Sequence, residues 1–240
     1  MIERKLTFKE SKLFIKIDGE RFFDIAHSCL LRNRGELEEY ITSNPLFQST
    51  LEPLEVERDA PRVVKLMAEA AERTGVGPMA AVAGALADLM LEEVVKEGCR
   101  FAIIENGGDI AMKVDRTAKV VVYAGSSPFS GKIGFQITPD ETPIGVCTSS
   151  GTVGHAISFG NADAAVAFAD GAVLADAAAT AIGNEVKSER DVRKAAEFAK
   201  KLRIRGAVVI RGESIAAWGR IPKVIKSKGL PEYFYKEFFE

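Results

Sequence analysis

Five short apolar runs follow one another between residues 100 and 149, and this series constrains the fold more than any other feature. They read RFAIIE, DIAMKV, KVVVYA, KIGFQI and IGVCTS, and turn residues separate them. Short apolar runs at near-regular spacing are typical of strands in one sheet. Helical patterns are grouped before this series instead of alternating with it, which favours an α+β fold over a doubly wound parallel sheet.

Patterns on either side of the series complete the expected architecture. Alternating side chains at 5–17 predict a short hairpin. Further elements are expected in this order: helices at 24–40, 60–74 and 78–96, a strand at 164–169, a helix at 172–182, a charged helix at 188–202, and strands at 206–210 and 215–219. The tail at 221–240 carries no assignable pattern. We therefore expect one domain over residues 1–240, with an antiparallel or mixed sheet packed against helices.

Composition excludes several classes of protein. The chain has 240 residues, of which 47% are hydrophobic and 28% charged, as in an ordinary globular protein. A net charge of -2 gives no electrostatic footprint for nucleic acid. Residues 1–10 lack a signal-peptide core, and the longest weakly polar run is too short to span a bilayer. We therefore expect a cytoplasmic protein that has no membrane partner.

The cysteines and histidines exclude two kinds of structural site. Three cysteines without close spacing fit reduced thiols better than a disulfide framework. With only two histidines and no CxxC motif, a zinc site is not expected.

Two turn-like motifs are candidates for ligand binding. In ENGGDI, Asn106 and Gly107 predict a tight hairpin, while Gly107 and Gly108 would also let a ligand approach the backbone amides. In TSSG, Thr148 and Ser149 either form a hydroxyl-capped turn or bind an anion such as phosphate. Spacing alone leaves both interpretations open for each motif.

Two single residues beside TSSG carry reactive groups. Cys147 is either a small buried hydrophobe or a reactive thiolate, the latter if backbone amides face its sulfur. His155 is either a structural histidine or a general acid or base. We can identify no nucleophilic triad around either of them.

The stretch ADAAAT places a carboxylate and a hydroxyl on one side of an alanine-rich helix. Asp176 and Thr180 are four residues apart and therefore share a helix face. Hard divalent cations such as Mg²⁺ take oxygen ligands of these kinds. The alternative is that Asp176 begins or caps its own helix, in keeping with the helix dipole.

Taken in order, these motifs resemble the ApbE-like superfamily, whose best-known members are Mg²⁺-dependent FAD:protein FMN transferases. The matching strings are GALAD, NGGDI, TSSG, GHAI and ADAAAT, which fall within about residues 75–185. RTGVGPMAAVAGALAD and ENGGDI look closer still to an uncharacterised prokaryotic branch of that superfamily. The resemblance implies the ApbE-like α+β fold.

The resemblance also implies roles for individual residues. Asp176 and Thr180 match the metal-ligating pair, with a backbone carbonyl near Ala80 as a candidate third ligand. The flavin site would be lined by the following residues: Asn106, Gly107, Gly108, Asp109, Thr148 and Ser149. His155 matches the conserved histidine of the family and is expected, with Asp176 and Cys147, among the catalytic residues.

The chain departs from the transferase pattern in three places. Ala83 stands before Gly84 where transferases usually carry lysine, which removes a cation near a bound pyrophosphate. TSSGTVG is one residue longer than the family loop, and the segment after His155 is shorter.

Three functions follow as hypotheses. The first is a protein that binds FAD, FMN or a related nucleotide with Mg²⁺, with flavin transfer to a partner protein as its extension; homo-oligomers are compatible with it. The second is a thiol-based sulfur-assimilation protein that carries a persulfide on Cys147, since the branch that the chain resembles has been linked with sulfide assimilation. The third is a non-catalytic ApbE-like binding subunit.

Overall fold

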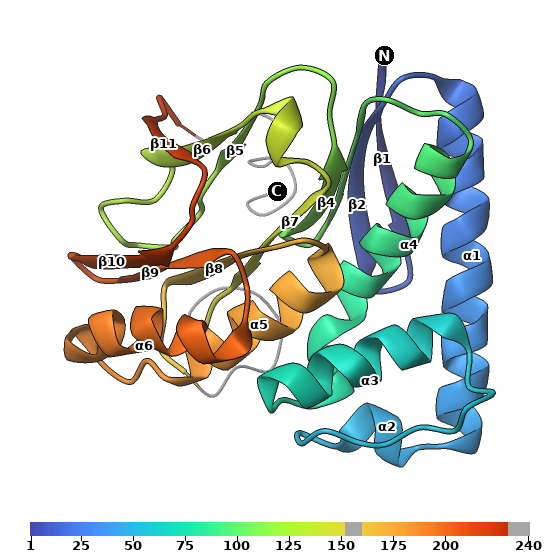
Figure 1. The fold of residues 1–240 in the computed structure, drawn as a ribbon, viewed down its shortest axis with the longest axis horizontal. Helices are drawn as coiled ribbons and strands as arrows, with labels where there is room; N and C mark the ends of the chain where they lie inside the picture. The colour runs from blue at the N-terminus through green and yellow to red at the C-terminus, as the bar shows by residue number, and fades with distance from the viewer. Residues whose placement is uncertain (152–159, 230–240) are drawn as a thin grey trace.

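The computed structural model describes residues 1–151 and 160–229, which form two antiparallel sheets (Figure 1). In spatial order, the larger sheet contains β1 (Ile2–Phe8), β2 (Ser11–Ile17), β3 (Ala102–Asn106), β4 (Asp109–Lys113), β7 (Ile144–Ser149), β8 (Ala164–Ala169), β9 (Gly206–Arg211) and β10 (Ser214–Gly219). The smaller sheet contains β11 (Lys223–Lys226), β6 (Ile133–Ile137) and β5 (Ala118–Val121). The antiparallel α+β architecture expected from the grouped strand patterns is confirmed.

Helices cover one face of the larger sheet and the small sheet covers the other (Figure 1). The α-helices are α1 (Glu20–Ser43), α2 (Leu46–Ser49), α3 (Arg62–Thr74), α4 (Val82–Lys96), α5 (Ala172–Asn184) and α6 (Val192–Phe198). Short 3₁₀ helices are η1 (Pro78–Ala81), η2 (Pro139–Glu141), η3 (Glu189–Asp191) and η4 (Ala199–Leu202).

Side chains of the central strands alternate strictly between these two cores. Along β8, Ala167 and Ala169 belong to the core beneath the helices, whereas Val166 and Phe168 belong to the core beneath the small sheet. This is the period of two that a strand imposes. Phe168 meets Phe135 of the small sheet edge to face, with ring centroids 4.8 Å apart. At these positions of β8 the helix side takes alanine and the side facing the small sheet takes larger residues.

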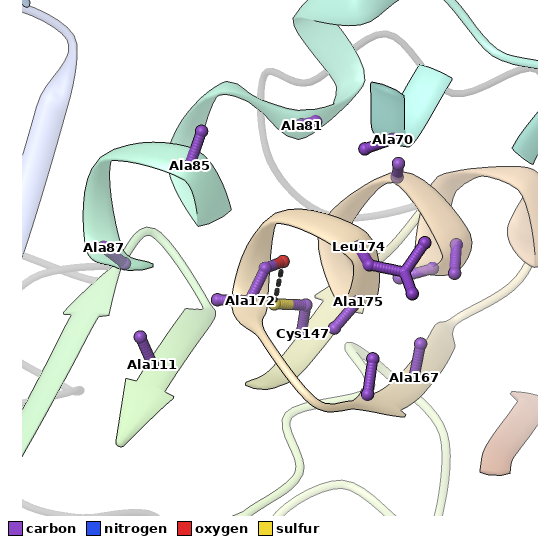
Figure 2. Close-up of a cluster of buried hydrophobic side chains, with 14 of the residues drawn as sticks. Ala70, Ala81, Ala85, Ala87, Ala111, Cys147, Ala167, Ala172, Leu174 and Ala175 are labelled. Atoms are coloured by element: carbon purple, nitrogen blue, oxygen red, sulfur yellow. Dashed lines mark hydrogen bonds between the residues drawn. The ribbon is translucent and has the colours of Figure 1, made fainter. Parts of the chain in front are cut away.

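Small residues on the helix side let α5 lie very close to the sheet and to α4. A Cβ atom on Gly145 of β7 would lie 2.3 Å from the carbonyl oxygen of Gly171, just before α5. A Cβ atom on Gly84 of α4 would lie 2.3 Å from the carbonyl oxygen of Ala172. The alanines drawn in Figure 2 fill the space between these elements. The alanine-rich sequence thus reflects close packing around α5 as well as helix propensity.

Most predicted elements are present, with shifted ends. The first hairpin, formed by β1 and β2, is confirmed, and α3 ends at Gly75 in the left-handed conformation. The helix predicted at 24–40 extends over Glu20–Ser43, and the one predicted from Pro78 begins as η1 before it continues as α4. The unassigned tail contains β11, which pairs with β6.

Within the described ranges, no single helix is both long and apolar enough to cross a membrane. Arg62–Thr74 and Pro78–Lys96 meet those criteria only when they are joined across a bend of 105°.

Candidate functional site

Helices α4 and α5 each provide an aspartate whose carboxylate accepts backbone N–H groups near the N-terminal end of the other helix. The two carboxylate oxygens of Asp88, on α4, accept the backbone N–H groups of Ala172 and Val173 at the start of α5, both at 2.8 Å. In return, Oδ2 of Asp176, on α5, accepts the backbone N–H of Gly84 near the start of α4 at 2.9 Å. Each helix therefore carries the aspartate that satisfies the free amides of the other.

The position of Asp176 corrects one of the two sequence interpretations. Asp176 lies in the second turn of α5, so it does not cap its own helix; it hydrogen-bonds instead to the backbone N–H groups of Gly84 and Ala83. Burial raises the pKa of Asp176 to about 7, although these two N–H groups act in the opposite direction. Its carboxylate is thus costly to ionise in the unliganded protein.

Asp109 and Cys147 lie opposite each other on β4 and β7 and face the same helices. The register pairs these two residues, and residues that pair across antiparallel strands share a sheet face. Burial, followed by the charge of Asp176, raises the pKa of Asp109 well above its usual value, and the neighbouring Cys147 side chain and the Thr148 backbone only partly offset this rise. Asp109, which is buried, and Asp176, which is partly buried, therefore interact as a carboxylate pair.

The burial and the raised pKa of Cys147 disfavour a reactive thiolate. Its side chain is fully buried, and Sγ donates a hydrogen bond to the carbonyl oxygen of Ala172 at 3.3 Å (Figure 2). Burial and the nearby charges of Asp109 and Asp176 raise the pKa of the thiol well above its usual value. The interpretation of Cys147 as a small buried residue therefore fits the structure, and the nucleophile interpretation does not.

The hairpin at ENGGDI is present, with one correction to its details. Asn106 pairs with Asp109, so the two central positions are Gly107 and Gly108, with φ of 65° and 105°. These values explain why both positions hold glycine. Gly107 is exposed and Gly108 half-exposed, so the turn presents backbone at the end of β3 and β4.

The two hydroxyls of TSSG do not form the expected turn. Thr148 and Ser149 are the last two residues of β7 and pair with Val166 and Ala165 of β8. Because strand side chains alternate, Ser149 faces the helices with Cys147, whereas Thr148 faces the other side. The two hydroxyls therefore diverge, and only Ser149 shares a face with Asp109.

Three further residues place the site at the start of α4. The side-chain amide of Asn106 is buried and donates to the carbonyl oxygen of Ala83 at 3.4 Å. Helix η1, which contains Ala80, packs against α5. Thr180 is half-exposed, one turn after Asp176 on α5. Most of the predicted site residues thus gather where α4, α5 and the β3–β4 hairpin meet, whereas His155 lies outside the described residues.

The oxygen donors around Asp176 are of the kind that Mg²⁺ takes. The described residues hold no cluster of three or more His, Cys, Asp or Glu side chains able to bind a metal. A cation at Asp176 would therefore rely on one carboxylate and on neutral oxygens from Thr180 and the Ala80 backbone. Mg²⁺ is commonly held in this way, with water and substrate phosphates completing its shell. A carboxylate that accepts two N–H groups still has lone pairs free for a cation.

Sequence reasoning missed the role of Asp88. It appeared only as the last residue of GALAD, because its partners at the start of α5 are 84 and 85 residues further along the chain. The signal available was the glycine at position 171, which leaves α5 without a side-chain cap of its own.

Comparisons with known proteins agree with this fold. A family model described as AbpE bacteria matches residues 3–208. A UPF0280 protein from Methanococcus aeolicus is 44% identical over 232 residues, covering 95% of this chain and 94% of that protein. A UPF0280 protein from Methanosarcina acetivorans is 44% identical over 237 residues, covering 98% and 93%.

Among solved structures, the apo form of the flavinyl transferase ApbE from Pseudomonas stutzeri aligns with a TM-score of 0.61. The alignment covers 99% of this chain and 96% of that one at 14% identity, so this likeness concerns the fold. The chain therefore belongs to the AbpE bacteria family and, among proteins of the ApbE-like fold, to the UPF0280 branch.

Proposed function

We propose that this protein binds a flavin nucleotide together with Mg²⁺ where α4, α5 and the β3–β4 hairpin meet, and that it transfers flavin to an acceptor. The observation that carries the proposal is the interaction of Asp109, which is buried, with Asp176, which is partly buried. Burial and neighbouring carboxylates raise both pKa values, backbone N–H groups only partly offset the rise, and no lysine or arginine is among the main influences in the described chain. A cation would favour the ionised form of both carboxyl groups.

Asp176, Thr180 and the Ala80 carbonyl would hold the cation, as the family resemblance implies. Asp109 would strengthen cation binding through its charge, since the cation lowers the cost of ionising both carboxylates. The Gly107–Gly108 turn would admit the ligand close to backbone amides, since neither glycine carries a side chain.

Bound Mg²⁺ would supply charge stabilisation for a phosphate oxygen as the pyrophosphate of FAD is cleaved. The residues of this chain would orient the nucleotide, and the bound cation would favour the ionised form of the carboxylates. Because position 83 holds alanine where transferases usually carry lysine, no cationic side chain there would pair with the pyrophosphate. We therefore expect FAD affinity to depend strongly on Mg²⁺.

Thermal unfolding tests the binding part of the proposal. Purified protein is heated without ligand, with Mg²⁺ alone, with FAD alone, and with both. Ligand at 100 times its Kd stabilises a protein by about 2.7 kcal/mol, which for a chain of this size raises the Tm by roughly 5–10 °C. We expect this rise with Mg²⁺ and FAD together, and its loss in Asp176→Asn.

The transfer part needs a chemical readout. Release of AMP from FAD in the presence of Mg²⁺ together with flavin bound covalently to an acceptor, both measured by chromatography, would support flavin transfer. Binding without AMP release would favour the non-catalytic subunit instead. If neither Mg²⁺ nor any of FAD, FMN and ATP shifts the Tm, the proposed function fails.

A further inference from the structure

Both N-terminal amides of α5 depend on a side chain from another helix. The residue before α5 is Gly171, which has no side chain to act as a cap. A Cβ atom at this position would lie 2.7 Å from Oδ2 of Asp88, so the Asp88 carboxylate occupies the space that a local cap would need. Asp88 is therefore the cap of α5, supplied by α4 across the helix–helix contact.

The reciprocal hydrogen bonds of Asp88 and Asp176 form a closed ring of contacts between α4 and α5. Gly84 and Asp88 are one turn apart on α4, and Ala172 and Asp176 are one turn apart on α5. Asp88 accepts from Ala172, and Asp176 accepts from Gly84. A shift of α5 along or away from α4 would therefore break both sets of hydrogen bonds together.

The same contact joins this ring to the sheet. The carbonyl oxygen of Ala172 accepts the hydrogen bond from Cys147, and it lies where a side chain on Gly84 would have to stand. The first residue of α5 is therefore held by α4 on one side and by β7 on the other. Because backbone approaches so closely here, small displacements cannot be absorbed by side-chain movement.

We propose that Asp88 is a positioning residue for Asp176: by holding the start of α5 against α4, it sets where the Asp176 carboxylate stands. The proposal rests on the proposed function only in taking Asp176 as a cation ligand. In this inference Asp88 acts through the backbone amides of α5 that its two oxygens accept, and not through the cation or the nucleotide.

The test compares Asp88→Asn with a matched control at Asp163. Like Asp88, Asp163 accepts a backbone N–H, that of Gly212 at 2.7 Å; it is buried, pairs with Arg211 and lies just before β8. Both substitutions keep the shape of the side chain and remove a carboxylate that accepts a backbone N–H. Asp88→Ser, which keeps one oxygen, serves as a second variant if Asp88→Asn does not fold.

Two readouts separate positioning from a general loss of stability. The first is amide hydrogen exchange at Gly84, which is one turn from the substituted residue and is protected by Asp176. We expect exchange at Gly84 to accelerate at least tenfold in Asp88→Asn and to stay within twofold of wild type in Asp163→Asn. The second is the affinity for Mg²⁺ alone, which we expect to fall about tenfold in Asp88→Asn only.

The outcomes distinguish this inference from the proposed function. Faster exchange at Ala172 and Val173 with unchanged exchange at Gly84 would show that Asp88 is only a local cap and would overturn the inference. Unchanged Mg²⁺ affinity in Asp88→Asn beside tight binding in wild type would overturn it as well. If wild-type protein binds no Mg²⁺, the proposed function fails, while exchange at Gly84 still decides whether Asp88 positions Asp176.

Discussion

Replacing Gly84 by alanine is expected to destabilise the protein, although alanine is the better helix former. The new Cβ atom would lie 2.3 Å from the carbonyl oxygen of Ala172, 2.6 Å from its carbonyl carbon and 2.8 Å from the Cβ atom of Asp176. Two of these three atoms belong to the backbone of α5, so no side-chain rotation relieves the overlap. The helices would have to separate, and the hydrogen bond from Gly84 to Asp176 would lengthen.

The expected magnitude is the difference between two opposing terms. Alanine in place of glycine favours a helix by about 0.5–1 kcal/mol. Overpacking a close contact costs about 1–3 kcal/mol, and the upper end applies because backbone atoms are involved. The net loss of about 2 kcal/mol corresponds to a fall in Tm of roughly 4–8 °C in a chain of this length.

Gly35→Ala is the matched control in the same protein. Gly35 is an exposed residue within α1, and nothing lies within 4 Å of a Cβ atom placed there. Only the propensity term applies, so this variant should gain about 0.5–1 kcal/mol. Urea unfolding and calorimetry measure both variants. A Gly84→Ala protein as stable as wild type, or two variants that shift in the same direction, would refute the reasoning.

Three further expectations concern Asp176, Cys147 and Asp163. Because the pKa of Asp176 is raised to about 7 in the folded protein, the unfolded chain ionises at lower pH than the folded one. Without metal, wild type should therefore lose stability relative to Asp176→Asn as pH rises from about 4 to about 7. Urea unfolding from pH 4 to 8 should show this trend, and a stability difference independent of pH would contradict it. Cys147 should react with iodoacetamide at pH 8 only as fast as the native protein opens, and rapid labelling of folded protein would contradict its burial. Asp163→Asn should lower stability by about 1–3 kcal/mol, because the Gly212 N–H loses a charged partner; a neutral result in calorimetry would count against this.

Local pattern was sufficient to predict most of the secondary structure. The strands at 164–169 and 206–210 are buried on both faces, so they appear as unbroken apolar runs bounded by turn residues. Gly75 marked the end of α3 for a reason that the structure bears out, its left-handed conformation. By contrast, β11 has the sequence KVIK, and mostly exposed residues give no hydrophobic signal; its strand state comes from pairing with β6, about 90 residues earlier in the chain.

The candidate site could be predicted only where its geometry is local. The spacing of Asp176 and Thr180 gives a shared helix face without any knowledge of the rest of the fold. The partners of Asp176 could not be predicted, because Gly84 is 92 residues away and the contact depends on how two helices cross. The expected hydroxyl turn at Thr148 and Ser149 was wrong for a similar reason: pairing with β8 extends β7 through both residues.

The cation site itself is the central claim, and anomalous scattering tests it most directly. Crystals of the wild-type protein grown with FAD and saturating Mn²⁺, which accepts the same oxygen ligands as Mg²⁺, would be measured near the manganese absorption edge. The account predicts one anomalous peak within coordination distance of the Asp176 carboxylate, the Thr180 hydroxyl and the Ala80 carbonyl, and no such peak in Asp176→Asn. No peak at Asp176 in the wild-type crystals, or one bound entirely by other residues, would contradict it.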